Sequence, residues 1–414
     1  MDDFYDFRAP GEGAPYGPVD VSVRSCARMP MRSAYSRAGL SVLVCYGVAS
    51  VVTVLLLAAA FLFFLVPEFW EWYQGLSETG PVPDLIQGIR NLLNGSLQNW
   101  LELLSVLGAG IGFGVSIPII RKVLRYRSCT PVKKQPLSAP LFLLVILAAY
   151  GLWGVGVYAG NFIEFLGYSI GDASYMTPEP GKGILLSLLP LLYAVFGAPV
   201  LEELIFRKTL LNVLHPYGEK CAALVTALLF GLVHGNSGQF TLAFLLGLLF
   251  AAVYLKTGNI LYTMVLHFII NLTASIPEFL LYFDIDIGEF FTYYLLAGLT
   301  VVGLVVLFCI RKKDLFKLTA SAEEHSNRAM FRNPGMLIAV IAGSVSLVAT
   351  DLMMIVSAVS AYQSAVPLLA VLSTCVTILI VVLVCTLGGR NRKNGTAPPA
   401  GDGRTPDDTP YNFT

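Results

Sequence analysis

The sequence has little charge. Asp, Glu, Lys and Arg make up 13% of its 414 residues, whereas a soluble globular protein has about 25%. Hydrophobic residues make up 56% of the chain, and its mean hydropathy is +0.70. A soluble protein would have to bury most of this apolar surface in one core, and domain cores stop growing at about 250–300 residues. The composition therefore excludes a soluble globular protein and predicts a polytopic membrane protein.

The sequence also lacks the patterns of several other classes. Its seven cysteines include no C-x-x-C pair, so neither a disulfide framework nor a thiolate metal cluster is predicted. The G-x-G patterns between Gly108 and Gly112 lie inside an apolar run, where such spacing is typical of helix packing and not of nucleotide binding. The 27 basic residues cancel the 27 acidic ones, and no nucleic-acid partner is expected.

Long apolar runs are what the sequence does contain, and each membrane-crossing helix needs about 20 such residues. About ten runs qualify: 38–66, 103–120, 137–163, 183–205 continuing toward 214, 221–236, 239–255, 259–276, 290–310, 335–358 and 365–387. The first run is too long and starts too far into the chain to be a cleaved signal. We therefore expect an all-α, polytopic membrane helical bundle of about ten transmembrane helices.

The distribution of basic residues predicts the orientation of this bundle. With the N-terminus in the cytoplasm and ten spans, 25 of the 27 Lys and Arg residues fall on the cytoplasmic side, and only Arg90 and Lys182 lie outside. Cytoplasmic loops carry an excess of Lys and Arg, so the pattern favours an N-in and C-in topology. The Gly-, Pro- and Asp-rich segments 1–37 and 389–414 are expected to be disordered cytoplasmic tails.

Ionisable residues inside the apolar runs are concentrated between residues 202 and 271. They divide the chain into N-terminal helices (38–182), a polar core (183–276) and C-terminal helices (277–388) with a basic cytoplasmic loop at 311–334. A charge at the centre of a span costs about 2.5–3.5 kcal/mol on insertion scales and is a functional-site candidate by default. At about 1.5 Å per residue, the polar residues of the core's three motifs reach similar depths, which is what one shared site requires. The motifs are Glu202-Glu203-x-x-x-Arg207, Phe230-x-x-x-His234 and His267-x-x-x-Asn271.

The spacing within the motifs predicts their roles. Residues four apart share a helix face, so Glu203 is expected to pair with Arg207 as a structural carboxylate. Glu202 is about 100° away around the helix and has no such partner. A carboxylate and an imidazole can hold and deprotonate a water molecule, which assigns Glu202 and His234 to general-base catalysis.

The third motif supplies the remaining chemistry. His267 and Asn271 offer hydrogen-bond donors to a developing oxyanion. Together with an activated water, these residues predict hydrolysis of an amide bond inside the membrane. We expect no cofactor.

Two alternatives use the same residues differently. Glu202, His234 and His267 are zinc-ligand types, but the chain has no H-E-x-x-H motif, and the expected ion pair disfavours Glu203 as a fourth ligand. A proton-coupled transporter would use the buried Glu and His residues as a relay. Pro190 and Pro199 interrupt the fourth run, as a transporter would require, but the sequence shows no inverted repeat. Asp351, near the outer end of the ninth run, has no expected partner and is interpreted as interfacial.

The three motifs, in this order on successive helices, resemble the CPBP family (CAAX protease and bacteriocin-processing, or Abi) of intramembrane glutamic endopeptidases. The resemblance covers about 183–276, including the run 257–262 before His267, and no motif residue is missing. It implies that Glu202 and His234 activate water and that His267 and Asn271 stabilise the oxyanion, with Phe230 as a supporting residue. It also implies a membrane-protein or lipidated-peptide substrate, contact with the lipid bilayer and an integral, multi-pass location, expected to be a bacterial plasma membrane.

The segments outside this core match no motif of the family. They are the 37-residue N-terminal tail, the loop 311–334 and the last two spans. A non-catalytic relative remains an alternative, acting as a membrane chaperone or a bacteriocin-immunity protein that keeps the motif residues as a structural cluster.

Overall fold

The computed structural model describes residues 29–75, 96–126, 136–168, 184–312 apart from 282, 284 and 289, and 318 and 333–361. Within these residues all regular secondary structure is helical. Its longer helices are α2 (Met31–Gly75), α4 (Ser96–Val123), α5 (Ala139–Tyr168), α9 (Glu219–Val233), α10 (Ser237–Thr257), α11 (Ile260–Ala274), α13 (Ala297–Lys312) and α15 (Pro334–Ala361). The fourth apolar run is a series of shorter pieces, and α12 (Ile276–Leu281) and the π-helix η4 (Phe290–Leu296) lie between α11 and α13.

The predicted all-helical membrane fold is confirmed. Seven helices in the described residues are long and apolar enough to cross a membrane. Two of the predicted spans, 221–236 and 259–276, correspond to α9 and α11, which have only 15 residues each. The last predicted span, 365–387, lies outside the described residues. The count of ten spans, the N-in orientation and the domain boundaries therefore stay predictions.

The first described helix begins inside the segment that was predicted to be a disordered tail. Residues 31–37 were expected to be disordered, but α2 starts at Met31. The reason is burial: Ala34 and Tyr35 are fully buried, and Tyr217 donates a hydrogen bond to the carbonyl of Met29. Residues 1–28 and 389–414 of the predicted tails lie outside the described residues.

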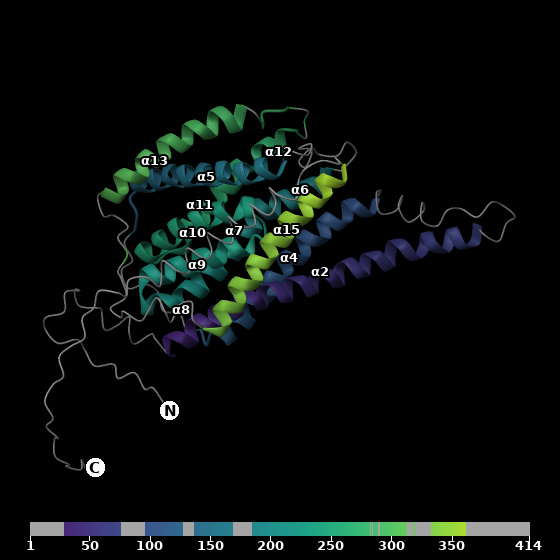
Figure 1. Cartoon of the computed structure of the whole chain (residues 1–414), viewed down its shortest axis with the longest axis horizontal. Helices are drawn as coiled ribbons and strands as arrows, with labels where there is room; N and C mark the ends of the chain where they lie inside the picture. Colours follow the sequence, from purple (N-terminus) through teal and green to yellow (C-terminus); the bar gives the residue numbers. More distant parts are fainter. Residues whose placement is uncertain are drawn as a thin grey trace, which may run out of the picture.

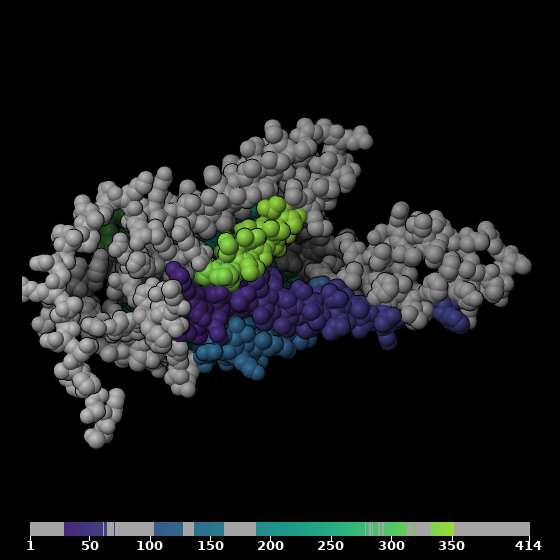
Figure 2. Space-filling model, turned by 60° about the horizontal axis from the view of Figure 1, so that its bottom comes forward, coloured from purple at the N-terminus to yellow at the C-terminus, as the bar shows by residue number. Residues whose placement is uncertain are grey.

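The helices pack in two connected groups (Figure 1). One apolar core joins α2 and the fourth run to α9, α10 and α15, and the other joins α5, α10, α11 and α13. Figure 2 shows α15 lying against α2, with α4 on the other side of α2. Because α10 contributes to both cores, it is the central helix of the bundle.

Glycines allow the outer helices to approach closely. A Cβ atom at Gly108 would lie 2.6 Å from Thr53 Cα, and one at Gly112 would lie 2.9 Å from the backbone nitrogen of Ala49. These contacts join α4 to α2, which confirms that the G-x-G patterns serve helix packing. Gly303 of α13 meets Gly151 of α5 in the same way.

The fourth apolar run is repeatedly broken. It consists of α6 (Ile184–Leu192), the π-helix η1 (Tyr193–Gly197), α7 (Ala198–Glu203), the π-helix η2 (Leu204–Leu211), α8 (Asn212–Leu214) and the 3₁₀ turn η3 (His215–Tyr217). Pro190 and Pro199 lie on either side of η1; proline lacks an N–H and crowds the carbonyl four residues earlier, which a wider turn relieves. Within η2, the hydroxyl of Thr209 donates to the carbonyl of Leu204 at 2.8 Å. The breaks therefore have local causes in the sequence.

Candidate active site

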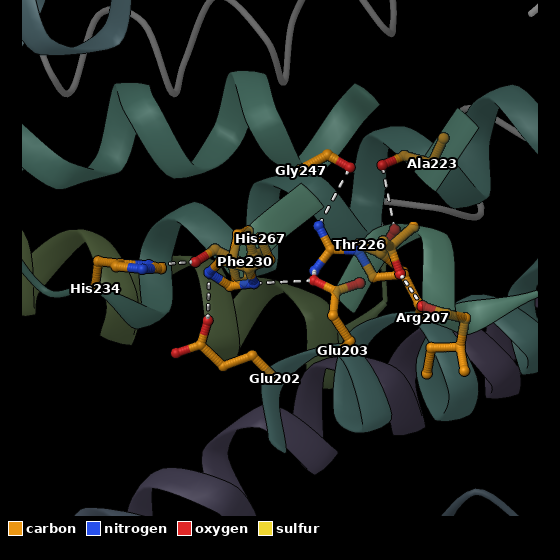
Figure 3. A network of polar contacts seen from close by, with 11 residues as sticks. Glu202, Glu203, Arg207, Ala223, Thr226, Phe230, His234, Gly247 and His267 are labelled. Atoms are coloured by element: carbon orange, nitrogen blue, oxygen red, sulfur yellow. Dashed lines mark hydrogen bonds and ion pairs between the residues drawn. The ribbon is translucent and has the colours of Figure 1, made fainter. Parts of the chain in front are cut away.

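An ion pair forms the centre of the polar core. Arg207 Nη1 lies 2.9 Å from Glu203 Oε1, and both side chains are almost fully buried, at 1% and 0% exposure. This is the pair that the four-residue spacing predicts. His267 joins it from α11, with Nδ1 3.2 Å from the same Glu203 oxygen. The network therefore links the fourth run to α11 (Figure 3).

The Arg207 guanidinium has a surrounding suited to a buried cation. It lies over the Phe230 ring at 4.4 Å and over the Phe250 ring at 5.3 Å, which are favourable cation–π distances. Nη2 also donates to the carbonyl of Gly247 at 3.5 Å. A buried ion pair needs such additional contacts to offset the loss of hydration. Glu203 and Arg207 thus hold α9, α10 and α11 around a fixed charge pair, which is a structural role.

Glu202 faces a different side of the same helix. Its Oε2 lies 3.7 Å from His267 Nε2, within ion-pair range but beyond a hydrogen bond, and its side chain is 14% exposed. Among the described residues this buried oxygen has no hydrogen-bond partner. Glu203 Oε2 and Arg207 Nε are likewise buried without a hydrogen bond in the described residues, so the cluster as a whole contains unsatisfied polar atoms, which are costly in a protein interior.

A small cavity lies beside Glu202. It has a volume of about 10 Å³, comparable with the space that one water centre needs. Side chains from four segments line it: Val42, Cys45 and Tyr46 of α2, Phe113 of α4, Glu202, Ile205 and Phe206 of the fourth run, and Val233 of α9. The cavity therefore lies on the side of Glu202 that faces α2 and α4.

His234 lies at the end of α9, where the helix stops. It is the C-cap residue, and Gly235 follows with φ +70°, a left-handed conformation that glycine adopts without strain. The His234 ring packs edge-on against Phe230 at 5.1 Å, and its Nδ1 lies 2.8 Å from the Phe230 carbonyl. Because a carbonyl only accepts, Nδ1 must donate, which leaves the lone pair of the neutral ring on Nε2.

Both histidine rings pack against the ring of Phe230, but their polar contacts differ. Phe230 contacts His267 at 5.9 Å between ring centroids, as well as His234. His267 contacts both glutamates. Among the contacts of the described residues, none joins His234 to Glu202. The structure therefore places His267, rather than His234, directly beside the Glu202 carboxylate (Figure 3).

Asn271 lies one turn along α11 from His267. Its Nδ2 donates to the carbonyl of Ala194 at 2.8 Å. Ala194 belongs to η1, where the π-turn alters the backbone hydrogen bonding. Asn271 thus connects α11 to the broken part of the fourth run, and one of its two amide hydrogens is used there.

Asp351 corrects one expectation from the sequence. It was expected to have no partner, but its carboxylate accepts hydrogen bonds from the hydroxyl and the backbone N–H of Ser237, at 2.5 and 3.3 Å. Ser237 is the first residue of α10, and α15 brings Asp351 there across the bundle. A carboxylate at a helix N-terminus satisfies free N–H groups and the helix dipole, so Asp351 is half-buried and paired.

The metal alternative gains no support from the arrangement of ligands. In the part of the chain that the structure describes, no group of three His, Cys, Asp or Glu side chains is placed to hold a metal ion. Of the alternative ligand set, Glu202 and His267 adjoin, whereas His234 contacts neither of them in the described network. The donor set does not fit a closed metal site, and we derive no step through a metal.

Sequence reasoning did not identify one tyrosine near the site. Tyr46 lines the cavity beside Glu202, and its hydroxyl donates to the carbonyl of Leu232 at 3.0 Å. Tyr46 is on α2, far from the motif region in sequence. In the sequence, Tyr46 is a polar side chain within an apolar run. Tyrosines are too common in such runs for this position to indicate a site.

One comparison with known proteins matches the segment that carries the three motifs. Residues 184–273 match a family model described as Rce1-like, type II CAAX prenyl endopeptidase Rce1-like. All three motifs fall inside this segment. Searches of curated proteins and of solved structures give no match. On residues 184–273, which carry Glu202, His234 and His267, the resemblance to the CPBP family of CAAX-type membrane peptidases is therefore confirmed.

Proposed function

We propose that the protein is an intramembrane endopeptidase that uses Glu202 as the general base. The single observation that carries the proposal is the position of the Glu202 carboxylate. Its Oε2 is buried and without a hydrogen bond among the described residues, faces His267 Nε2 and adjoins a cavity of about 10 Å³. Glu203 has an arginine partner on its own helix, whereas the contact of Glu202 with an ionisable group is the His267 ring at 3.7 Å, and an ionisable side chain inside a span is a functional-site candidate.

The charges of the cluster define its resting protonation. Glu202, Glu203 and Arg207 together carry one net negative charge, and one additional proton makes the buried cluster neutral. His267 Nδ1 already donates to Glu203. We assign the additional proton to His267 Nε2, because two unprotonated atoms facing each other would repel. Glu202 is then an ionised carboxylate that faces the cationic His267 ring.

Hydrolysis follows from these assignments. In this mechanism a water that enters with the substrate between Glu202 and His234 donates a hydrogen bond to His234 Nε2 and passes its other proton to Glu202 as its oxygen attacks the amide carbonyl. His267 Nε2–H and the second N–H of Asn271 stabilise the oxyanion. When the carbon–nitrogen bond breaks, Glu202 returns the proton to the leaving amine. The products are a carboxylic acid, which loses its remaining proton to water after release, and an amine terminus, and the site regains its resting state.

We propose a membrane-associated or lipidated peptide as the substrate class. The glutamates lie within a candidate span, 188–217, so the scissile bond must enter an apolar environment. A peptide that is itself inserted in lipid, or anchored by a prenyl group, reaches this depth without desolvating a free charged chain. The matched family, a CAAX prenyl endopeptidase family, supports a prenylated C-terminal peptide as the first probe.

The test uses full-length protein in lipid nanodiscs with a fluorogenic, farnesylated peptide that ends in a C-a-a-X sequence. Glu202→Gln should lower kcat by about 10²- to 10⁴-fold, the usual contribution of a general base. Glu219→Gln, the same chemical change at the first residue of α9, is the control and should leave kcat unchanged. Full activity in Glu202→Gln would contradict the assignment.

A second arm addresses the substrate and the non-catalytic alternative. Glu202→Gln protein, expressed in cells and purified with bound peptides, should retain intact substrate that mass spectrometry identifies and that wild-type protein cleaves. If wild-type protein cleaves neither the farnesylated probe nor any trapped peptide, the chaperone or immunity alternative is favoured over the peptidase.

A further inference from the structure

The turn that carries His234 is held from outside the family-like core. The core match ends at residue 273, and the last described helix, α15, begins at Pro334. Yet α15 supplies the carboxylate of Asp351 to the first residue of α10, three residues after His234. Asp351 is the last residue of the candidate span 334–351, and its half-buried carboxylate uses both of its oxygens on this turn.

Hydrogen bonds at the adjacent residues Ser237 and Asn236 connect Asp351 to the backbone of His234. Asp351 holds Ser237, which is only 2% exposed, through both its hydroxyl and its N–H. The neighbouring residue, Asn236, caps α10 by accepting from the N–H of Gln239 at 2.8 Å. Its amide nitrogen donates to the carbonyl of His234 at 3.1 Å. Movement of Ser237 would therefore be transmitted to the backbone of His234.

Packing on the other side of the turn restricts it further. A Cβ at Gly343 of α15 would lie 2.9 Å from Leu232 Cβ, and a Cβ at Gly235 would lie 3.5 Å from Ser346 Oγ. The hydroxyl of Tyr46 on α2 holds the carbonyl of Leu232. Two helices from outside the matched core, α2 and α15, therefore hold the segment 232–237. Tyr46 of α2 bonds to Leu232 at one end, and Asp351 of α15 bonds to Ser237 at the other.

We propose that Asp351 is a positioning residue for the reaction. It fixes the turn 234–237 so that the His234 ring keeps its hydrogen bond to the Phe230 carbonyl and directs Nε2 toward the attacking water. This inference rests on the proposed peptidase function. It makes the C-terminal helix α15 part of the catalytic apparatus, although α15 contributes no group that touches the substrate.

The test compares three variants in nanodiscs. Asp351→Ala removes both acceptors. Asp351→Asn keeps one carbonyl oxygen for the Ser237 N–H and an amide that can donate to its hydroxyl. Ser344→Ala is the matched control on the same helix, because its buried hydroxyl has no hydrogen-bond partner in the described residues. Each variant is assayed for kcat and KM with the farnesylated probe and for amide hydrogen exchange by mass spectrometry.

The expected result is local and kinetic. Asp351→Ala should accelerate exchange in the peptide 230–240 but not in 250–265, and should lower kcat by about 10- to 100-fold with little change in KM, as expected when a catalytic group is misplaced by about 1 Å. Asp351→Asn should recover most of kcat, and Ser344→Ala should match wild type in both measurements.

Three outcomes would overturn the proposal. Unchanged exchange at 230–240 in Asp351→Ala would show that the carboxylate does not hold the turn. Faster exchange with full kcat would show that the turn does not need it. Faster exchange across all peptides would indicate a general structural role. If wild type cleaves no substrate, the peptidase proposal fails by itself, while the exchange measurement still decides whether Asp351 orders the turn.

Discussion

The hydroxyls of the surrounding helices and the charged and amide groups of the site find their hydrogen-bond partners in different places. Three buried hydroxyls of the surrounding helices donate to carbonyls of their own helix: Ser41 to Arg37, Ser116 to Phe113 and Thr300 to Leu296. In the site, the charged and amide groups bond across helices. Glu203 meets His267, Arg207 reaches the Gly247 carbonyl, and Asn271 reaches Ala194.

The surrounding helices are also longer and more regular than the helices of the site. The surrounding helices α2, α4 and α15 are uninterrupted over 45, 28 and 28 residues. The site helices α9 and α11 have 15 residues each, and the fourth run is broken by two π-segments. A hydroxyl can be satisfied within one regular helix, whereas a charge needs partners from several, so irregular backbone accompanies the charges.

The largest effect is expected from removing the buried cation. Arg207→Ala leaves the Glu203 carboxylate buried without its partner and should destabilise the protein by about 3–5 kcal/mol. Heating in detergent followed by size-exclusion chromatography should show a much smaller folded fraction than for wild type. Thr300→Val, which removes a buried hydroxyl from a surrounding helix, is the control and should cost only about 1 kcal/mol. Equal effects of the two changes would contradict the comparison.

A double substitution tests whether the loss of stability in Arg207→Ala comes from the unpaired charge of Glu203. Glu203→Gln with Arg207→Met leaves no unpaired charge and should recover most of the folded fraction lost in Arg207→Ala. If the double variant is as unstable as the single one, the pair does more than neutralise charge.

An intermediate effect is expected where the surrounding helices touch. A Cβ at Gly303 would lie 2.6 Å from Gly151 Cα and would meet the Leu147 carbonyl, whereas a Cβ at Gly298, on the same helix, would meet nothing within 4 Å. Gly303→Ala should therefore separate α13 from α5 and cost about 1–3 kcal/mol, measured by thermal unfolding in detergent. Gly298→Ala should be neutral or stabilising, since alanine favours helix over glycine. A neutral Gly303→Ala would mean that these helices can move apart freely.

The smallest effect is expected from chelation. If the site works by Glu202 alone, incubation with a chelator of divalent metals should leave the cleavage rate of the farnesylated probe unchanged, and elemental analysis should find no stoichiometric zinc. Zinc at one equivalent per chain together with chelator-sensitive cleavage would overturn the general-base assignment.

The sequence predicted those parts of the site that depend on spacing along one helix. The four-residue interval predicted the Glu203–Arg207 pair, and counting residues from the membrane edges predicted similar depths for Glu202, His234 and Asn271. Depth says nothing about rotation around the helix axis, so the sequence did not indicate that His267 lies beside Glu202.

Contacts between distant segments were beyond the reach of the sequence. Asp351 and Ser237 are separated by 114 residues, and nothing in either local pattern indicates the other. The turn between α10 and α11 could be predicted from its own residues, since Gly258 with φ +63° ends α10 and Asn259 caps α11. This turn lies in the family-like run 257–262. The sequence therefore predicted local turns, but it did not predict the packing of α15.

The π-segment η2 sets the phase of the fourth span. An α-helix advances about 100° per residue, and η2 accommodates its eight residues in wider turns directly after Glu203. Closing these wider turns into α-helix without changing the number of residues would rotate Glu202 about the span axis relative to the cytoplasmic end of the span. A chain with every motif residue intact would then have lost the direction in which Glu202 points. The helix type between Glu203 and Asn212, and not only the motif residues, therefore sets the geometry of the site.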